Sequence, residues 1–517
     1  MTASDLELTA DERALARRVH EVGRDTLLPI AHAWGERHEM CRDLIRAMAD
    51  NDLFGLNIPA GYGGRGGDHR YSVLLCLIRE TLGHLDPVVD FHFGLQGLGT
   101  AAIVRQGNDA QRAEYLPSLV AGEKIFAFVL TEPHSGSDVL GMRTRARRDG
   151  DGWVIDGSKT FISGVPDADV HVVLARTGEA ERGKDITAFI VPRDTPGMTG
   201  RQDLTLGAPH AIGTLEFDGC RVPDSAVIGE VNQGLAVAFG TLEVYRPSVG
   251  ALAVGMGRRA MDLARDVVVG REAFERRLVD FEAVRAILAR RHVDLAGSRR
   301  LVYRAAANRD AGLDTTREAA MAKLRATEVA IGAVYDAQQL HGGRGVLVGS
   351  EVEALARHAR QATIYEGTSE IQRGIIARSE FRRVRDGDPM APTSGPGQAA
   401  VAALRGAFDD LVRWLADQDV HRHQTVQYRL ADAAVAVDIA ERLDDEVATA
   451  ADVPLAEAVA GVALVDAVDG VAAVRRELDR RVGVPAGLAI GPDVQRSVDD
   501  LLLTVADTLL VEDAAHA

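Results

Sequence analysis

Cysteine, lysine and aromatic residues are scarce in this chain of 517 residues. The three cysteines, Cys41, Cys76 and Cys220, are far apart and odd in number. This excludes a disulfide framework or a cysteine zinc site and indicates a reducing compartment. Aromatic residues make up only 5%, too few for a platform on which nucleic-acid bases stack. With 59 basic and 76 acidic residues, the net charge of −17 also argues against nucleic-acid binding.

Long apolar runs are also missing. No stretch of 18 apolar residues occurs, so no segment is expected to span a membrane. The first thirty residues carry acidic side chains from Asp5 onward and have no apolar stretch, so no secretory signal is expected. The histidines show no metal-ligand spacing, and no metal site is expected. These absences together predict a cytoplasmic protein.

The hydrophobic pattern divides the chain into five parts. Helical spacing dominates residues 1–125, whereas short apolar runs between turn residues indicate strands in residues 126–232. Helical spacing returns in residues 233–385 and, beyond a proline- and glycine-rich linker at residues 386–397, in residues 398–517. Because helices and strands do not alternate as in a doubly wound fold, we predict a mainly α protein with a central β-domain.

Two local patterns give narrower expectations. The segment Gly61-Tyr-Gly-Gly-Arg-Gly66 has the glycine spacing of a dinucleotide-binding loop. Its flanks look helical and no βαβ unit follows, so we interpret it as a glycine loop between helices. Leu278, Phe281, Val284 and Leu288 are spaced to share one face, which predicts a long helix through all four.

Three segments carry groups suited to chemistry. Residues 126–138 end a predicted strand and turn through hydroxyls and glycine, whose donors can hold a phosphate or a flavin edge. Residues 157–164 alternate an aromatic side chain with a hydroxyl on one strand. In residues 364–373, Glu366 precedes a predicted helix capped by Thr368 or Ser369. A carboxylate in an apolar cleft there can act as a base. Taken singly, an ordinary turn, an ordinary strand and a solvated capping acid explain these segments better.

Four motifs occur in an order that resembles the acyl-CoA dehydrogenase family. They are Thr131-Glu-Pro-His-Ser-Gly-Ser-Asp138, Gly157-Ser-Lys-Thr-Phe-Ile-Ser-Gly164, Gln339-Leu-His-Gly-Gly-Arg-Gly345 and Tyr365-Glu-Gly-Thr-Ser-Glu-Ile-Gln372. The resemblance covers residues 10–385. It implies an α-domain, a β-barrel or sandwich domain and a four-helix α-domain.

The segment after the linker adds a second resemblance. Gln427-Tyr-Arg-Leu-Ala-Asp432 is similar to the extra helical domain of very-long-chain acyl-CoA dehydrogenases, which implies a homodimer. Residues 401–517 contain 10 arginines, no lysine and 22 acidic residues, a charge of −12. Because such a segment lacks a basic face for anionic lipid, we predict no membrane binding.

The family resemblance implies FAD as cofactor and oxidation of an acyl-CoA thioester to a trans-2-enoyl-CoA. Glu366 matches the base that takes the α-proton while the β-hydride passes to flavin N5. The alternative base position of some family branches is occupied by Tyr245, which is no carboxylate. The implied FAD-binding residues are Phe128, Leu130, Thr131, Gly136, Ser137, Phe161, Ile162, Ser163, Arg271, Phe274, Gln339, Gly342, Gly343, Thr368 and Glu370. The implied substrate-binding residues are Ser137, Glu243, Arg246, Tyr365 and Gly367.

The resemblance also implies partners. Arg271, Phe274, Gln339, Gly342 and Gly343 would meet the FAD of a neighbouring subunit, which makes the active form an oligomer. An electron-transfer flavoprotein would reoxidise the flavin. Such a reaction belongs to fatty-acid metabolism.

Several alternatives stay open. The thioester carrier can be CoA or an acyl-carrier protein. A flavin oxidase or monooxygenase is a second class, although such members usually lack the glutamate. A non-catalytic assembly factor is a third, hinted at only by Glu282 and His358 in place of a common Gln and Asp. Gly94, Gly97 and Gly99 either leave room for a long acyl tail or pack a helix, and we favour packing.

Overall fold

The computed structural model describes residues 8–66, 70–179, 184–387, 398–417, 423–447 and 453–479. Two compact units divide the chain, one formed by Asp11–Ser248 and the other by Val249–Ala517 with the first ten residues. The division falls inside one long helix, α7 (Gly234–Gly270). Most of the predicted linker, residues 388–397, lies outside the described residues. The mainly α fold with a central β-domain is confirmed, whereas the five-part division stays a prediction.

The first unit begins with a series of α-helices. They are α1 (Ala10–Val22), α2 (Leu28–Trp34), α3 (Arg42–Asp50), α4 (Tyr71–Leu85), α5 (Pro87–Gln106) and α6 (Asp109–Val120). Asp86 caps α5 by accepting a hydrogen bond from Val88 N at 2.6 Å, and Pro87 occupies the first helical position. The glycine loop predicted between helices is confirmed, since a short 3₁₀ turn, Ala60–Tyr62, stands there between α3 and α4.

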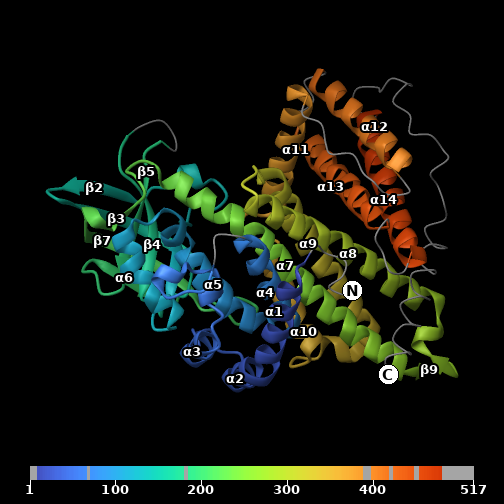
Figure 1. Cartoon of the computed structure of the whole chain (residues 1–517), viewed down its shortest axis with the longest axis horizontal. Helices are drawn as coiled ribbons and strands as arrows, with labels where there is room; N and C mark the ends of the chain where they lie inside the picture. The colour runs from blue at the N-terminus through green and yellow to red at the C-terminus, as the bar shows by residue number, and fades with distance from the viewer. Residues whose placement is uncertain are drawn as a thin grey trace. The chain divides into compact units, whose positions relative to one another are not determined.

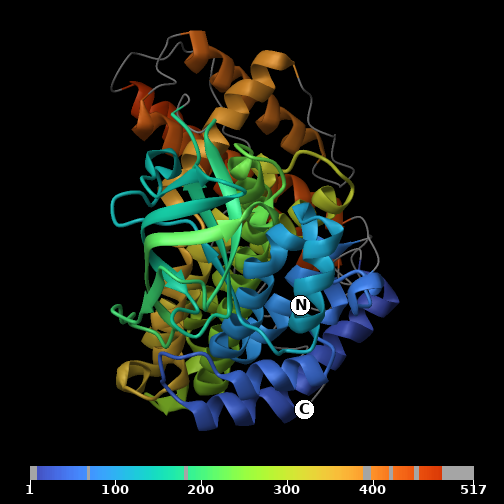
Figure 2. The same cartoon turned by 90° about the vertical axis from the view of Figure 1, so that its left-hand side faces the viewer.

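The second half of this unit is one eight-stranded sheet. Its strands are β1 (Phe126–Val129), β2 (Arg145–Asp149), β3 (Gly152–Ser163), β4 (Val170–Arg176), β5 (Ile186–Pro192), β6 (Met198–Arg201), β7 (Ile212–Pro223) and β8 (Val227–Ile228). They lie in the order β6-β7-β3-β2-β4-β5-β8, and β1 pairs in parallel with β4. Helix α5 packs against β1, β4 and β8, so the sheet has a helical cover on this side (Figures 1 and 2).

The second unit is helical in its described residues, apart from one small hairpin of β9 (Glu272–Ala273) and β10 (Arg276–Arg277). After α7 come α8 (Glu282–Asp310), α9 (Thr316–His341), α10 (Glu351–Ala362) and α11 (Ser369–Asp386). The region beyond the predicted linker forms α12 (Gln398–Asp417), α13 (Gln424–Val447) and α14 (Val453–Asp479). Figure 1 shows these three helices together, with α13 beside α11.

One predicted helix begins later than its apolar spacing suggested. Leu278 lies in a 3₁₀ turn, and Phe281 has an extended backbone with φ −87° and ψ 126°. Helix α8 therefore begins at Glu282, four residues beyond Leu278. The hairpin just before it needs a turn to redirect the chain, and spacing alone does not reveal such a turn.

Crossing a bilayer needs a long apolar helix, and none is found among the helices in the described ranges.

A neutral histidine joins two helices in the core of the first unit. His92 of α5 is 2% exposed, and its Nε2 accepts a hydrogen bond from Cys41 N at 2.9 Å, just before α3. Nδ1 lies 2.8 Å from Val88 O, so it carries the proton. Burial lowers the pKa of His92 to about 4, although the carbonyl of Val88 opposes the shift.

This imidazole makes stability depend on pH. The unfolded ring binds a proton near pH 6.5 and the folded ring only near pH 4, so unfolding takes up a proton between these values. Stability therefore falls as pH drops through this window, by about 2 kcal/mol at pH 4.5. We expect His92→Gln to remove that part of the loss in urea unfolding at pH 7.5 and 4.5. The exposed His32 offers a control, and equal pH slopes in wild type and His92→Gln would contradict the prediction.

Candidate active site

An irregularity in β3 exposes an aromatic ring in the first unit. Pairing between β3 and β7 shifts register between Lys159 and Ile162, and Phe161 in this bulge has a φ of 55°. A left-handed backbone costs an aromatic residue about 1–3 kcal/mol, so it persists only where its surroundings enforce it. The bulge leaves Phe161 56% exposed while Ile162 is buried. Ser163 follows, and its hydroxyl is hydrogen-bonded to His210 Nε2 at 2.8 Å.

A buried ion pair supports the chain beside this bulge. Lys159 Nζ donates to Glu132 Oε1 and to Leu130 O, both at 2.9 Å, and both ionic side chains are almost fully buried. The Glu132 carboxylate also accepts hydrogen bonds from Arg143 N and Thr144 N. Burial raises the pKa of Glu132, but Lys159 and these donors outweigh it and hold the pKa below its usual value. The buried Glu132 and Lys159 side chains therefore fix the turn after β1.

The predicted FAD-binding residues of the first unit lie close together, at the end of β1 and in the bulge of β3. Thr160 N donates to Thr131 O at 3.0 Å, which places the bulge of β3 beside the end of β1. Phe128, Leu130 and Thr131 are half-buried there, while Gly136 and Ser137 are exposed. An exposed aromatic ring beside open backbone and hydroxyl groups fits a flat polar cofactor such as a flavin. Ile162 can contribute only its backbone, because its side chain is 1% exposed.

The glycines of α5 are packing positions. A Cβ on Gly97 would lie 2.1 Å from Tyr245 Oη, and one on Gly99 would lie 2.6 Å from the Phe126 backbone. A Cβ on Gly94 would meet the Arg79 guanidinium at 2.9 Å. The packing interpretation is thus supported, since none of the three leaves space for a ligand. Of the predicted substrate residues on α7, Glu243 is half-buried and Arg246 is 7% exposed.

The loop of the predicted base belongs to the second unit. Glu366 and Gly367 both have positive φ, 55° and 100°, so the chain turns sharply between α10 and α11. The Gly367 carbonyl accepts hydrogen bonds from Lys323 Nζ of α9 at 2.8 Å and from Gln372 Nε2 of α11 at 3.0 Å. Thr368 is the N-cap of α11, as one of the two predicted alternatives had it. The half-buried Glu366 side chain is thus placed by a loop with two anchors.

Two polar atoms beside this loop are ready for a further partner. Ser369 Oγ and Gln372 Oε1 are buried and have no hydrogen-bond partner among the residues that the structure describes. Buried polar atoms are normally paired, so they suit a site that receives a polar ligand. Glu370 is exposed, and its own backbone amide and the Thr368 hydroxyl lower its pKa.

The residues predicted to meet a second subunit lie on the surface of the second unit. Arg271, Phe274, Gln339, Gly342 and Gly343 are all exposed, and Phe274 is 89% exposed. Arg271 Nη1 is 3.4 Å from the place of a Cβ on Gly342, so the hairpin and the end of α9 are neighbours. Apolar side chains are exposed along this end of α9 and the turn after it, namely Tyr335, Val346, Leu347 and Val348. An apolar surface of this kind suits a subunit interface.

Sequence reasoning missed the residues that hold these segments. Glu132, Lys159 and Gln372 stood inside the quoted motifs without a role, and Lys323 was given no role at all. A rare lysine within an alanine-rich helix was a usable signal, because a buried ammonium needs a specific acceptor. Glu282, one of the noted departures, is simply exposed at the first turn of α8, where the helix dipole favours an acid.

Comparison with known proteins gives the family. Three acyl-CoA dehydrogenase domain models match the chain, the N-terminal domain at residues 9–123, the middle domain at residues 127–220 and the C-terminal domain at residues 232–381. The chain belongs to the acyl-CoA dehydrogenase family. It is a flavin oxidoreductase of that family, and the expected fold, enzyme class and FAD dependence are confirmed at this level.

Individual relatives agree with this assignment. An acyl-CoA dehydrogenase of Bacillus subtilis is 34% identical over 72% of this chain and 98% of its own length. A 3-(aryl)acrylate reductase of Clostridium sporogenes is 35% identical over 71% and 98%. The structure of an acyl-CoA dehydrogenase complexed with FAD from Bacillus anthracis matches 98% of this chain and 96% of its own, with a TM-score of 0.88 and 24% identity. That likeness supports the fold, including the helices after residue 397.

Removing the buried lysine should release flavin. Lys159→Met leaves the Glu132 carboxylate buried without its cation, a loss of about 3–5 kcal/mol. We expect a lower ratio of flavin to protein absorbance and a lower urea midpoint. Ser158→Ala is the matched control, because this hydroxyl lies on the same strand and donates to the partly exposed Glu216 carboxylate at 3.0 Å. Full flavin content in Lys159→Met would count against a supporting role.

Proposed function

We propose that this protein catalyses FAD-dependent α,β-dehydrogenation of an acyl-CoA thioester to a trans-2-enoyl-CoA, with Glu366 as the base. The observation that carries the proposal is the anchored left-handed loop at Glu366 and Gly367, which presents a carboxylate at the motif position of the family base. Such a loop is costly, and a solvated capping acid would not need it.

In the proposed reaction, different residues of the chain remove the proton, support the loop and contact the cofactor and substrate. In this proposal Glu366 takes the α-proton, and its backbone N–H donates to the thioester carbonyl, which makes that proton more acidic. Lys323 and Gln372 hold the loop by its carbonyl, so the carboxylate keeps one position while the proton moves. FAD, when bound, supplies the acceptor for the β-hydride. In the first unit, Phe161, Ser163 and the turn after β1 are the proposed FAD contacts, with Arg246, Glu243 and Ser137 toward substrate.

The thioester carrier has one alternative. One structural neighbour is a prolyl acyl carrier protein oxidase, at 24% identity, and its likeness bears on the fold alone. The net charge of −17 disfavours acidic carrier proteins over CoA by like-charge repulsion. We therefore propose CoA as carrier. A flavoprotein that accepts electrons from the reduced flavin is proposed as partner, following the family.

Replacing the base should separate binding from chemistry. We expect wild-type protein to lose its visible flavin absorbance when a saturated acyl-CoA is added without oxygen. Glu366→Gln should keep its flavin but lose this bleaching by at least about a thousandfold in rate, because the amide cannot accept the proton. Glu351→Gln, in a surface pair with Arg259, is the control. Bleaching at the wild-type rate in Glu366→Gln would refute the assignment, and bleaching only with acyl-carrier protein would change the substrate.

The exposed apolar surface leads to the proposal of a homodimer. Val348 is 89% exposed in the connection between α9 and α10, and a charge there would be buried if two chains met on this surface. We expect Val348→Asp to reduce the sedimenting mass to that of one chain, 55.3 kDa. Leu313→Asp, at the exposed turn between α8 and α9, is the matched control. An unchanged dimer in both variants would place the interface elsewhere.

A further inference from the structure

The helices after the predicted linker reach the part of the chain that carries Glu366. Helix α11 begins three residues after Glu366, and Gln372 in its first turns holds the carbonyls of Glu366 and Gly367. The position of the loop therefore depends on how the start of α11 is fixed. Two sets of ionic contacts fix α11, and helix α13 takes part in both.

The first set lies beside Gln372. Arg373 donates two hydrogen bonds to the Glu328 carboxylate of α9, both at 2.8 Å, and a third to Asp432 of α13 at 2.7 Å. Arg373 is largely buried, with 17% of its side chain exposed. The start of α11 is thus tied to α9 on one side and to α13 on the other.

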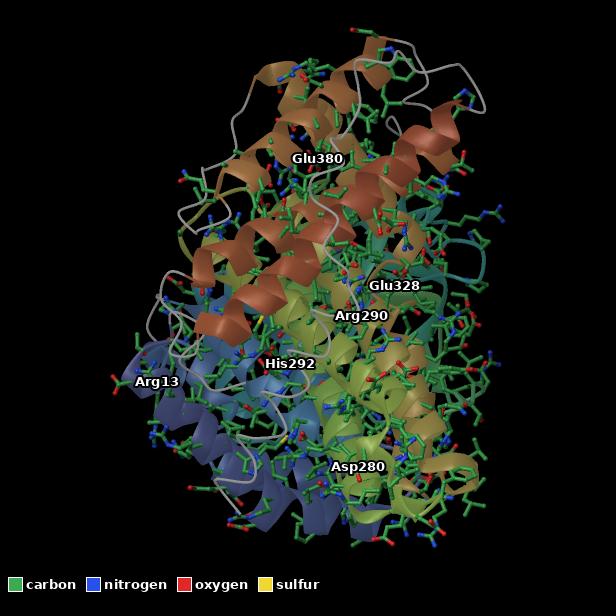
Figure 3. The ribbon with its side chains drawn as sticks, turned by 90° about the vertical axis from the view of Figure 1, so that its right-hand side faces the viewer. Arg13, Asp280, Arg290, His292, Glu328 and Glu380 are labelled. Atoms are coloured by element: carbon green, nitrogen blue, oxygen red, sulfur yellow. The ribbon has the colours of Figure 1, made fainter. Side chains whose placement is uncertain are left out.

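The second set lies two turns further along α11. Glu380, with no exposed side-chain surface, accepts from Arg317 of α9 at 2.5 Å, and Arg317 donates to Asp438 of α13 at 2.6 Å. Asp438 also accepts from Arg405 of α12 at 2.9 Å. Burial raises the pKa of Asp438, but Arg317 and Arg405 outweigh it and keep the carboxylate charged. Figure 3 labels Glu328 of α9, which belongs to the first set of contacts, and Glu380 of α11, which belongs to the second.

Helix α13 therefore runs along α11, bound to it directly at the first point and through Arg317 of α9 at the second. Arg373 and Glu380 are seven residues apart on α11, and Asp432 and Asp438 are six apart on α13, so each pair spans about two turns. We propose that α13 positions the Glu366 loop through the contact of Asp432 with Arg373. This rests on the proposed role of Glu366 as base, and it gives the C-terminal helices a part in the reaction. Asp432 is a positioning residue, because it acts through Arg373 and Gln372.

The test removes the loop-proximal contact and spares the buried one. Half of the Asp432 side chain is exposed, so Asp432→Ala should leave the fold intact, whereas a change at Asp438 would remove a buried carboxylate that two buried arginines share. In holoenzyme we expect kcat for anaerobic flavin bleaching to fall about fivefold, with KM within about twofold, because the base is displaced while substrate contacts stay. Asp432→Glu should restore most of the rate.

A second readout does not depend on bound flavin. Hydrogen exchange of the backbone amides in residues 366–372 should speed up by at least about threefold in Asp432→Ala, since the loop opens more often. The matched control is Asp466→Ala, which removes an equal charge from α14 where Asp466 pairs with Arg290 of α8 at 2.6 Å. Both its bleaching rate and its exchange at residues 366–372 should equal those of wild type.

A double-mutant cycle tests whether Asp432 acts on the loop through Arg373. If Asp432 acts through Arg373, then Asp432→Ala should add nothing in an Arg373→Met background. Wild-type exchange and wild-type kcat in Asp432→Ala would overturn the positioning proposal and leave Glu366 as base. Equal effects of Asp432→Ala and Asp466→Ala would also overturn it and indicate general loosening of the extension. A wild-type enzyme that no acyl-CoA bleaches would instead refute the proposed function, and the exchange result would still decide the contact.

Discussion

A left-handed turn at Glu366 and Gly367 has to be held by other parts of the chain, and this need organises the second unit. The buried ammonium of Lys323 and the amide of Gln372 both donate to the Gly367 carbonyl. Each comes from a different helix, α9 and α11, so the turn keeps its shape only while these helices keep their places. The long helices of the unit and the ionic contacts between them can therefore be understood as support for one short loop.

Buried charge is the means by which both units hold such segments. In the first unit, Lys159 and Glu132 fix the turn after β1, and in the second, Arg317 joins Glu380 to Asp438. Ion pairs of this kind add little net stability compared with apolar packing, because removing charges from water is costly. They do impose one arrangement, since breaking a pair leaves a buried charge behind. That property suits segments whose position matters more than their contribution to folding.

The strong acidity of the C-terminal segment has a structural reason in its described part. Its carboxylates face arginines of the preceding helices. Asp409 pairs with Arg383, Asp432 with Arg373, Asp438 with Arg317 and Asp466 with Arg290. Part of the charge of −12 is thus matched by the surface that these helices cover. These ion pairs join α12, α13 and α14 to the preceding helices of the unit.

The sequence by itself determined the class of fold, the order of helices and strands, the family and the candidate base. Each of these follows from local periodicity or from motifs of eight or so adjacent residues, as in residues 131–138 and 365–372. Only the tertiary structure decided which distant residues meet. The Lys159 pair with Glu132 spans 27 positions, Lys323 and Gly367 are 44 apart, and Arg317 and Asp438 are 121 apart. The left-handed backbone at Phe161 and the late start of α8 at Glu282 were also hidden. Both depend on neighbouring strands and turns, whose influence on a residue cannot be read from that residue's own side chain or spacing.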